Sequence, residues 1–211
     1  ALRDALSNDD GTIFRWSAHE NTVLNKLREE LLASAAPPPD KDALVNFIES
    51  ITSRSVSPKE KIHGPRTMVD LCDIAEKFYF HPSTKGSNSL KKVLPALMKS
   101  SIVLRETYGK ATYGGKGVSL NFVEPIAWWQ ERDGQVMDPY ALLPPVFDDV
   151  SRDETDAADE GLSEELKEGG AAMAAYARLQ FEDLSDTRRA SIESALLRYC
   201  ELDTLAMVMA I

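Results

Sequence analysis

The spacing of hydrophobic residues predicts alternating strands and helices in the first part of the chain. Segment 11–18 (GTIFRWSA) follows a turn signal and contains bulky residues that favour β structure, which predicts a short buried strand. From Glu20 apolar residues recur at helical spacing, and this helix should end at AAPPPD. Asp40 is expected to cap a second helix over 42–52. Its apolar stripe consists of Leu44, Phe47, Ile48 and Ile51.

The middle of the chain is expected to continue as strand, helix, loop and helix. A polar stretch over 53–65 precedes RTMVDLCDIAEKFYF (66–80), which we interpret as a short strand followed by a helix. The turn-rich segment 81–89 is expected to be a loop. Ser89 is a good N-cap for a helix over 90–98, which Pro95 should shorten or kink.

The second half combines an irregular region with two terminal helices. Residues 107–147 are rich in Gly, Pro and aromatic residues, with a tight turn expected at ERDG, and an acidic linker or short helix follows. We therefore expect an irregular insertion with an acidic linker over 107–168, within a single domain over 1–211. Segments 169–181 and 187–211 predict helices. One face of the last helix carries Ile192, Leu196, Tyr199, Asp203 and Ala206.

Composition sets broad limits on function. The net charge of −10 argues against nucleic acid, but residues 148–168 hold ten acidic and two basic side chains, so the remainder is near −2. Cys72 and Cys200 lie among apolar residues and are expected to be reduced thiols. Without an apolar run of about 18 residues, the chain is expected to be soluble and cytoplasmic. Its abrupt, Met-less start suggests a domain cut from a longer polypeptide.

Three residues stand out as candidates for chemistry. Tyr199 and Asp203 are four apart on a helix, so their side chains project from the same face. A buried Asp203 requires a partner. This partner is a divalent cation or the hydroxyl of a Tyr, unless the carboxylate is left in solvent. Glu20 is predicted where a strand ends and a helix begins, which suits either an active-site group or a first-turn residue favoured by the helix dipole. His19 is either a packing or capping residue or a functional one.

Several strings in the sequence resemble a known family. SAHENTVLNKL, RTMVDL, KGSNSLKKVLPAL and YCELDTLAM occur in the order found in a bacterial family that was first catalogued as a domain of unknown function. That family is similar to DEDD exonucleases of the ribonuclease H-like superfamily. The resemblance covers residues 11–211 and implies an α/β, helix-rich, three-layer fold, incomplete at its N-terminus because the strand of the first motif is absent.

The resemblance also implies a two-metal site. In DEDD exonucleases four carboxylates hold two divalent ions, and here Tyr-x-x-x-Asp resembles the tyrosine subclass. Asp203 would then bind metal, Tyr199 would position the attacking water, and Glu20 would stand at the second motif, where Asp is usual. Asp70 matches an acidic position after that motif, although an N-cap explains it equally well. The ions would be Mg²⁺ or Mn²⁺.

Further positions offer contacts to nucleic acid. Lys85, Ser87 and Lys91 would meet a phosphate near a helix N-terminus, or be a solvated Lys pair and a capping Ser. Trp128 and Trp129 would stack on unpaired bases, but adjacent side chains point in different directions, so at least one is expected in the core.

The sequence therefore predicts a metal-dependent 3′-to-5′ exonuclease acting on single-stranded DNA or RNA. The family's Asp-x-Glu motif occurs nowhere in the 211 residues, so we expect this fragment to be inactive and the full-length protein to be an enzyme. The resemblance also implies an upstream RecB-like nuclease domain and a role in DNA repair. The alternatives are a non-catalytic module that binds nucleic acid or protein, and a structural domain whose acidic segment binds a basic partner. The oligomeric state stays open.

Overall fold

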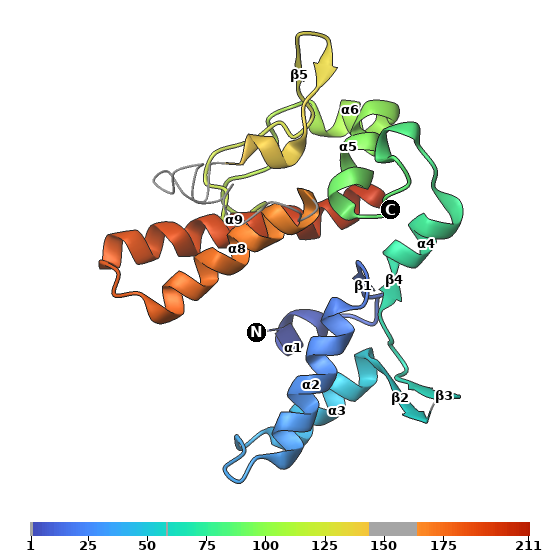
Figure 1. The fold of residues 1–211 in the computed structure, drawn as a ribbon, viewed down its shortest axis with the longest axis vertical. Coiled ribbons are helices and arrows are strands. Elements are labelled where there is room, and N and C mark those ends of the chain that lie inside the picture. Colours follow the sequence, from blue (N-terminus) through green and yellow to red (C-terminus); the bar gives the residue numbers. More distant parts are fainter. Residues whose placement is uncertain (1, 58, 144–163) are drawn as a thin grey trace. The chain divides into compact units, whose positions relative to one another are not determined.

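The fold consists of two compact units, Ala1–Phe80 and His81–Ile211 (Figure 1). The computed structural model describes residues 2–57, 59–143 and 164–211. Each unit has a hydrophobic core of its own. A domain can contain more than one such unit, so the single domain expected over 1–211 stays a prediction.

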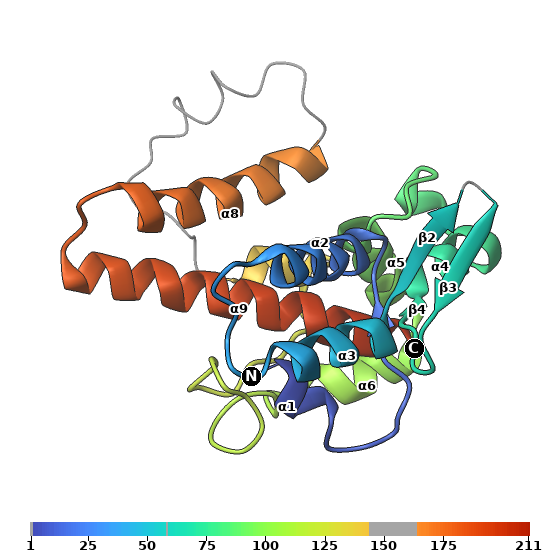
Figure 2. The same ribbon diagram turned by 90° about the horizontal axis from the view of Figure 1, so that it is seen from below.

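The described residues of the first unit form four helices, and a small apolar core lies among the first three of them. The helices are α1 (Leu2–Leu6), α2 (His19–Ala33), α3 (Lys41–Ile51) and α4 (Leu71–Phe78). Helices α2 and α3 pack side by side, as Figures 1 and 2 both show. Ile13, Ile51 and Met68 form the core, with the partly buried Leu6, Leu24 and Phe47 packed against it. Both predicted helices in this region are confirmed, because their apolar faces meet as the periodicity requires.

The N-cap expected of Asp40 is only partly correct. Asp40 does precede α3, but its side chain makes no cap hydrogen bond. Its carboxylate pairs instead with Arg3 at 3.0 Å. The guanidinium offers a charged donor, which makes a stronger hydrogen bond than a backbone N–H.

Two short sheets complete the first unit. Strands β1 (Phe14–Arg15) and β4 (Val69–Asp70) pair in parallel, and β2 (Ser53–Ser57) and β3 (Glu60–His63) form an antiparallel hairpin. The strand expected over 11–18 is confirmed at a length of only two residues. The predicted strand followed by a helix at 66–80 is also confirmed, as β4 and α4. The hairpin was not predicted, because 53–65 lacks an alternating apolar pattern.

The second unit begins with short helices. These are η1 (Pro82–Thr84), α5 (Leu90–Ser100) and α6 (Ile102–Tyr108). Ser89 precedes α5 as expected but makes no side-chain cap bond, and α5 continues through Pro95. Leu94, Ala96 and Met98 are almost completely buried, so packing holds the helix together where the proline removes an N–H.

The region expected to be an irregular insertion contains short regular elements and contributes buried side chains where the structure describes it. It contains β5 (Glu131–Arg132), β6 (Gln135–Val136) and η2 (Pro139–Leu142). Asp133 and Gly134 have positive φ angles of 53° and 74°, which confirms a tight hairpin turn at ERDG. Trp128 is fully buried against Phe122 and Tyr113. Most of the acidic linker, 148–163, lies outside the described residues.

Two long helices end the chain. Helix α8 (Glu164–Phe181) and helix α9 (Asp186–Ala210) lie antiparallel, side by side, in Figures 1 and 2. The first half of α9 packs on α8 through Ile192, which meets Ala175 and Leu179. Helix α9 also packs on α5. The described residues thus form a mixed α/β, helix-rich structure with short strands in two-stranded sheets, which confirms the coarse fold class.

Candidate functional site

A cluster of polar and aromatic side chains lies where α5 and α9 pack together. Tyr199 and Asp203 project from one face of α9, and Lys91 comes from α5. The Lys91 ammonium lies 5.0 Å from the centre of the Tyr199 ring and 5.8 Å from that of Tyr140, which belongs to η2. The two tyrosine rings are 6.0 Å apart. We call these four residues the α5–α9 cluster.

Tyr140 connects η2 to the carboxylate on α9. Its hydroxyl donates a hydrogen bond of 2.7 Å to Oδ1 of Asp203. Burial raises the pKa of the Tyr140 phenol far above its ordinary value, and the negative charge of Asp203 raises it further. Tyr140 therefore stays protonated and acts as a permanent donor to the carboxylate.

The structure brings together three of the predicted site residues. Lys91 contacts Tyr199, and both lie beside Asp203 in the α5–α9 cluster. Lys85 is exposed, with a left-handed backbone (φ 52°), and Ser87 accepts a bond of 3.3 Å from the Ser89 N–H. The loop that holds Lys85 and Ser87 therefore has a local structural role, and their phosphate contact stays a prediction.

Sequence reasoning missed Tyr140 and a second polar group close by. Both oxygens of Glu201 accept hydrogen bonds: Oε1 from the hydroxyls of Tyr113 (2.7 Å) and Ser119 (2.5 Å), and Oε2 from the backbone and side-chain amides of Asn121. Burial raises the pKa of Glu201, but these bonds outweigh burial and lower it overall. Glu201 ties the loop over 113–122 to α9. Its partners are far away in sequence, so only the structure reveals them.

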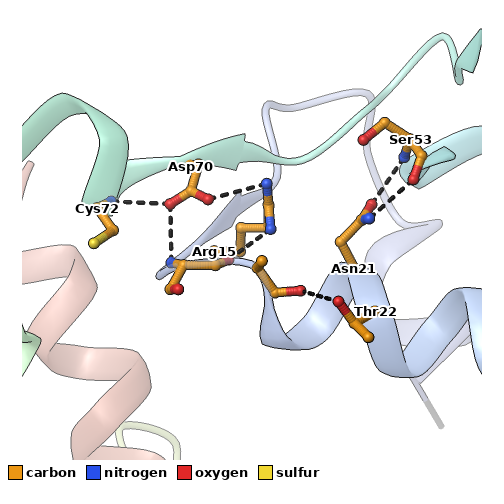
Figure 3. Close-up of polar contacts among 8 residues, drawn as sticks. Arg15, Asn21, Thr22, Ser53, Asp70 and Cys72 are labelled. Atoms are coloured by element: carbon orange, nitrogen blue, oxygen red, sulfur yellow. Dashed lines mark hydrogen bonds and ion pairs between the residues drawn. The ribbon is translucent and has the colours of Figure 1, made fainter. Parts of the chain in front are cut away.

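In the first unit, a polar network joins the carboxyl ends of β1 and β4 (Figure 3). Asp70 accepts hydrogen bonds at Oδ1 from the Ser17 N–H (2.9 Å) and the Cys72 N–H (3.0 Å), and its Oδ2 pairs with Arg15 at 3.0 Å. Arg15 also donates to the Ser17 carbonyl at 2.6 Å. These contacts hold Ser17 at a φ of 70°, a conformation that few residues other than glycine adopt.

This network supports the N-cap interpretation of Asp70, and its match to an acidic position of the family stays a prediction. Its side chain accepts from Cys72 N–H and so caps α4, as the N-cap interpretation predicts. Glu20 and His19 lie in the first turn of α2, just after β1, and both are exposed. The expected position of Glu20 is therefore confirmed, while its role stays a prediction. The strained Ser17 fixes the loop that leads to it.

The described residues alone do not make a metal site. Within residues 2–57, 59–143 and 164–211, no three His, Cys, Asp or Glu side chains converge to hold an ion. Neither cysteine of that part of the chain forms a disulfide, as expected. None of its helices has both the length and the apolar character needed to cross a membrane.

Comparison with known families gives a partial match. Residues 1–89 are similar to a family described as a domain of unknown function (DUF2779). The DUF2779 match includes Glu20 and Asp70 and ends just before α5, so it does not reach Lys91, Tyr199 or Asp203. It supports the expected resemblance to a domain of unknown function, and the likeness to DEDD exonucleases stays a prediction. Neither a curated protein nor a solved structure matches the chain significantly.

Proposed function

We propose that the protein is part of a metal-dependent 3′-to-5′ exonuclease with a ribonuclease H-like, three-layer fold. The observation that carries this proposal is the α5–α9 cluster. It sets a phenol, a carboxylate and an ammonium group side by side, although Lys91 and Asp203 are far apart in sequence. A nuclease of this kind needs a carboxylate for metal, a hydroxyl near water and a cation for phosphate.

Each residue has a distinct proposed task. Asp203 supplies a hard oxygen ligand of the type that Mg²⁺ and Mn²⁺ prefer. A carboxylate offers about four lone-pair sites, so the bond from Tyr140 orients it and is compatible with coordination. Tyr199 holds water, and Lys91 attracts the negatively charged backbone. Glu20, which follows a parallel strand of the first unit, is proposed as the acidic residue of the second motif.

The proposal requires ligands beyond these 211 residues. Two ions are held by four carboxylates in such enzymes, and the described residues contain no cluster of three ligands. An Asp-x-Glu strand elsewhere in the full-length polypeptide would supply the remaining pair. The ions would activate water and stabilise the leaving oxygen.

The test is degradation of 5′-labelled single-stranded DNA and RNA by the full-length polypeptide with Mn²⁺ or Mg²⁺. We expect a ladder that shortens from the 3′ end, and Asp203→Asn and Glu20→Gln should each abolish it. Glu193→Gln removes an exposed carboxylate from the same helix and should leave the ladder unchanged. Tyr199→Phe should slow degradation while Mn²⁺ binding, followed by calorimetry, is retained.

A folded full-length protein that degrades neither substrate would overturn the enzyme proposal. The second candidate is then a non-catalytic nucleic-acid-binding module. The missing Asp-x-Glu favours this alternative. Binding of a single strand by the full-length polypeptide, without degradation in the presence of Mn²⁺ or Mg²⁺, would distinguish it.

A further inference from the structure

A polar pocket of about 560 Å³ lies between α2 and the β2–β3 hairpin in the first unit. Its volume falls within the range of small-molecule and cofactor sites. Hydroxyl, amide and cationic side chains make up most of its described lining, in which Val56 is the one apolar residue. Such a lining suits a charged, strongly hydrated ligand and offers little to an apolar one.

The floor of the pocket is held by amide hydrogen bonds. Asn21 on α2 donates to the Ser53 carbonyl at 2.9 Å and accepts from the Ser53 N–H at 2.8 Å, as Figure 3 shows. Asn25, one turn later, donates to the same carbonyl at 3.0 Å. The side chain of Asn21 thus pairs with the backbone as another strand would. This clamp fixes the hairpin against the helix.

Cations outnumber carboxylates around this floor. Lys26 and Lys61 are exposed on α2 and β3, on opposite sides of the pocket. Arg28 and Arg54 share one oxygen of Glu49, at 2.7 and 3.1 Å, so two guanidinium groups face a single carboxylate. Glu29 is the other acidic residue of the group. A local excess of positive charge stands out in a chain whose net charge is −10.

We propose that this pocket binds the phosphodiester backbone of a single-stranded nucleic acid. Contacts to phosphate and sugar are made by Lys, Arg, Ser, Thr and Asn side chains, which are the types present here. Lys26 and Lys61 would each neutralise a phosphate from opposite sides, while the clamped hairpin keeps their spacing constant. Such contacts carry no sequence information.

This inference deepens the proposed function by assigning a surface that holds the strand. It differs from the α5–α9 cluster in residues and in chemistry, since it requires no metal. Binding can therefore be measured in the presence of a chelator, where no hydrolysis takes place.

The test is the salt dependence of binding between the full chain and fluorescent oligo-dT and oligo-U. Each lost phosphate contact lowers the slope of log K against log salt by about 0.7 for single strands. Lys26→Ala combined with Lys61→Ala should therefore lower the slope by about 1.4 and weaken binding. Lys110→Ala combined with Lys116→Ala removes the same charge from exposed positions in the second unit and should leave the slope unchanged.

Three results would overturn the proposal. The folded wild-type chain could fail to bind the oligonucleotides, or the two double variants could lose binding equally. The chain could also bind inorganic phosphate but no oligonucleotide. Asp203→Asn separates this proposal from the enzymatic one, because it should leave oligonucleotide binding intact. If the full-length polypeptide binds the oligonucleotides without degrading them, the pocket proposal stands and the exonuclease proposal is rejected. If the polypeptide degrades the substrates and the Lys26 and Lys61 variants bind normally, the pocket proposal is rejected and the exonuclease proposal stands.

Discussion

The Tyr140 hydroxyl donates a 2.7 Å hydrogen bond to the Asp203 carboxylate, across 63 residues of sequence. Tyr140 is only 9% exposed, so its hydroxyl cannot easily exchange this bond for water. Tyr140→Phe should lower the free energy of unfolding by about 2 kcal/mol, the usual cost of removing a hydrogen bond to a charged group. Urea unfolding measures the loss. Tyr176→Phe, at a phenol that is 60% exposed, is the matched control and should change stability very little.

Asp70 should be important for stability rather than catalysis. Asp70→Ala removes the cap of α4 and leaves the guanidinium of Arg15, whose side chain is 14% exposed, without its carboxylate. We expect a loss of about 3 kcal/mol, typical of breaking a buried ion pair. Hydrogen exchange of the α4 amides should rise accordingly. Glu76→Ala, on the exposed face of α4, should not have this effect, and equal effects would refute the structural role.

Trp128 should be a core residue and not a base-stacking platform. It is completely buried, with ring centres 5.2 Å from Phe122 and 6.0 Å from Tyr113. Trp128→Ala should cost about 3–5 kcal/mol, as large-to-small changes of buried aromatic residues do. Thermal unfolding checks this, with Val123→Ala, which changes an 81% exposed side chain, as control. A stable Trp128→Ala protein with weakened nucleic-acid binding would contradict the assignment.

Tyr113 should make the fold sensitive to alkaline pH. Burial raises the pKa of its phenol, and the hydrogen bond to Glu201 and the charge of that carboxylate raise it further. The unfolded phenol ionises near pH 10, so above about pH 10 the unfolded state holds fewer protons than the folded state. The stability that Tyr113 contributes is therefore fully present below about pH 10 and is lost as the pH rises above this value. Urea unfolding at several pH values should show a smaller fall for Tyr113→Phe than for the wild type.

Local pattern was enough to predict the longer helices, but not the short α1 and α6. The apolar periodicity of α2, α3 and α9 follows from the 3.6-residue turn, which neighbouring residues determine, and the ERDG turn follows from the positive φ that Asp133 and Gly134 tolerate. The inward face of α9 was predicted for the same reason, since Ile192 and Ala206 are buried.

The sequence did not predict which polar groups pair with one another. The β2–β3 hairpin has no alternating apolar pattern, and the contacts of Asn21 hold it to α2 from 32 residues away. The expected cap at Asp40 lacked its hydrogen bond because Arg3 competes for the carboxylate. Backbone and side-chain donors of many kinds satisfy an Asn or Asp equally well, so the residue type alone does not identify its partner.

Residues within a few positions of one another were enough to predict the longer helices, the tight turn and the face of α9 that carries Tyr199 and Asp203. The three-dimensional fold was needed to find that Tyr140 bonds Asp203, that Lys91 lies over Tyr199, and that Asp70 pairs with Arg15 and caps α4. Those contacts depend on which elements pack together. Packing follows from the burial of whole faces and leaves no short-range pattern in the sequence.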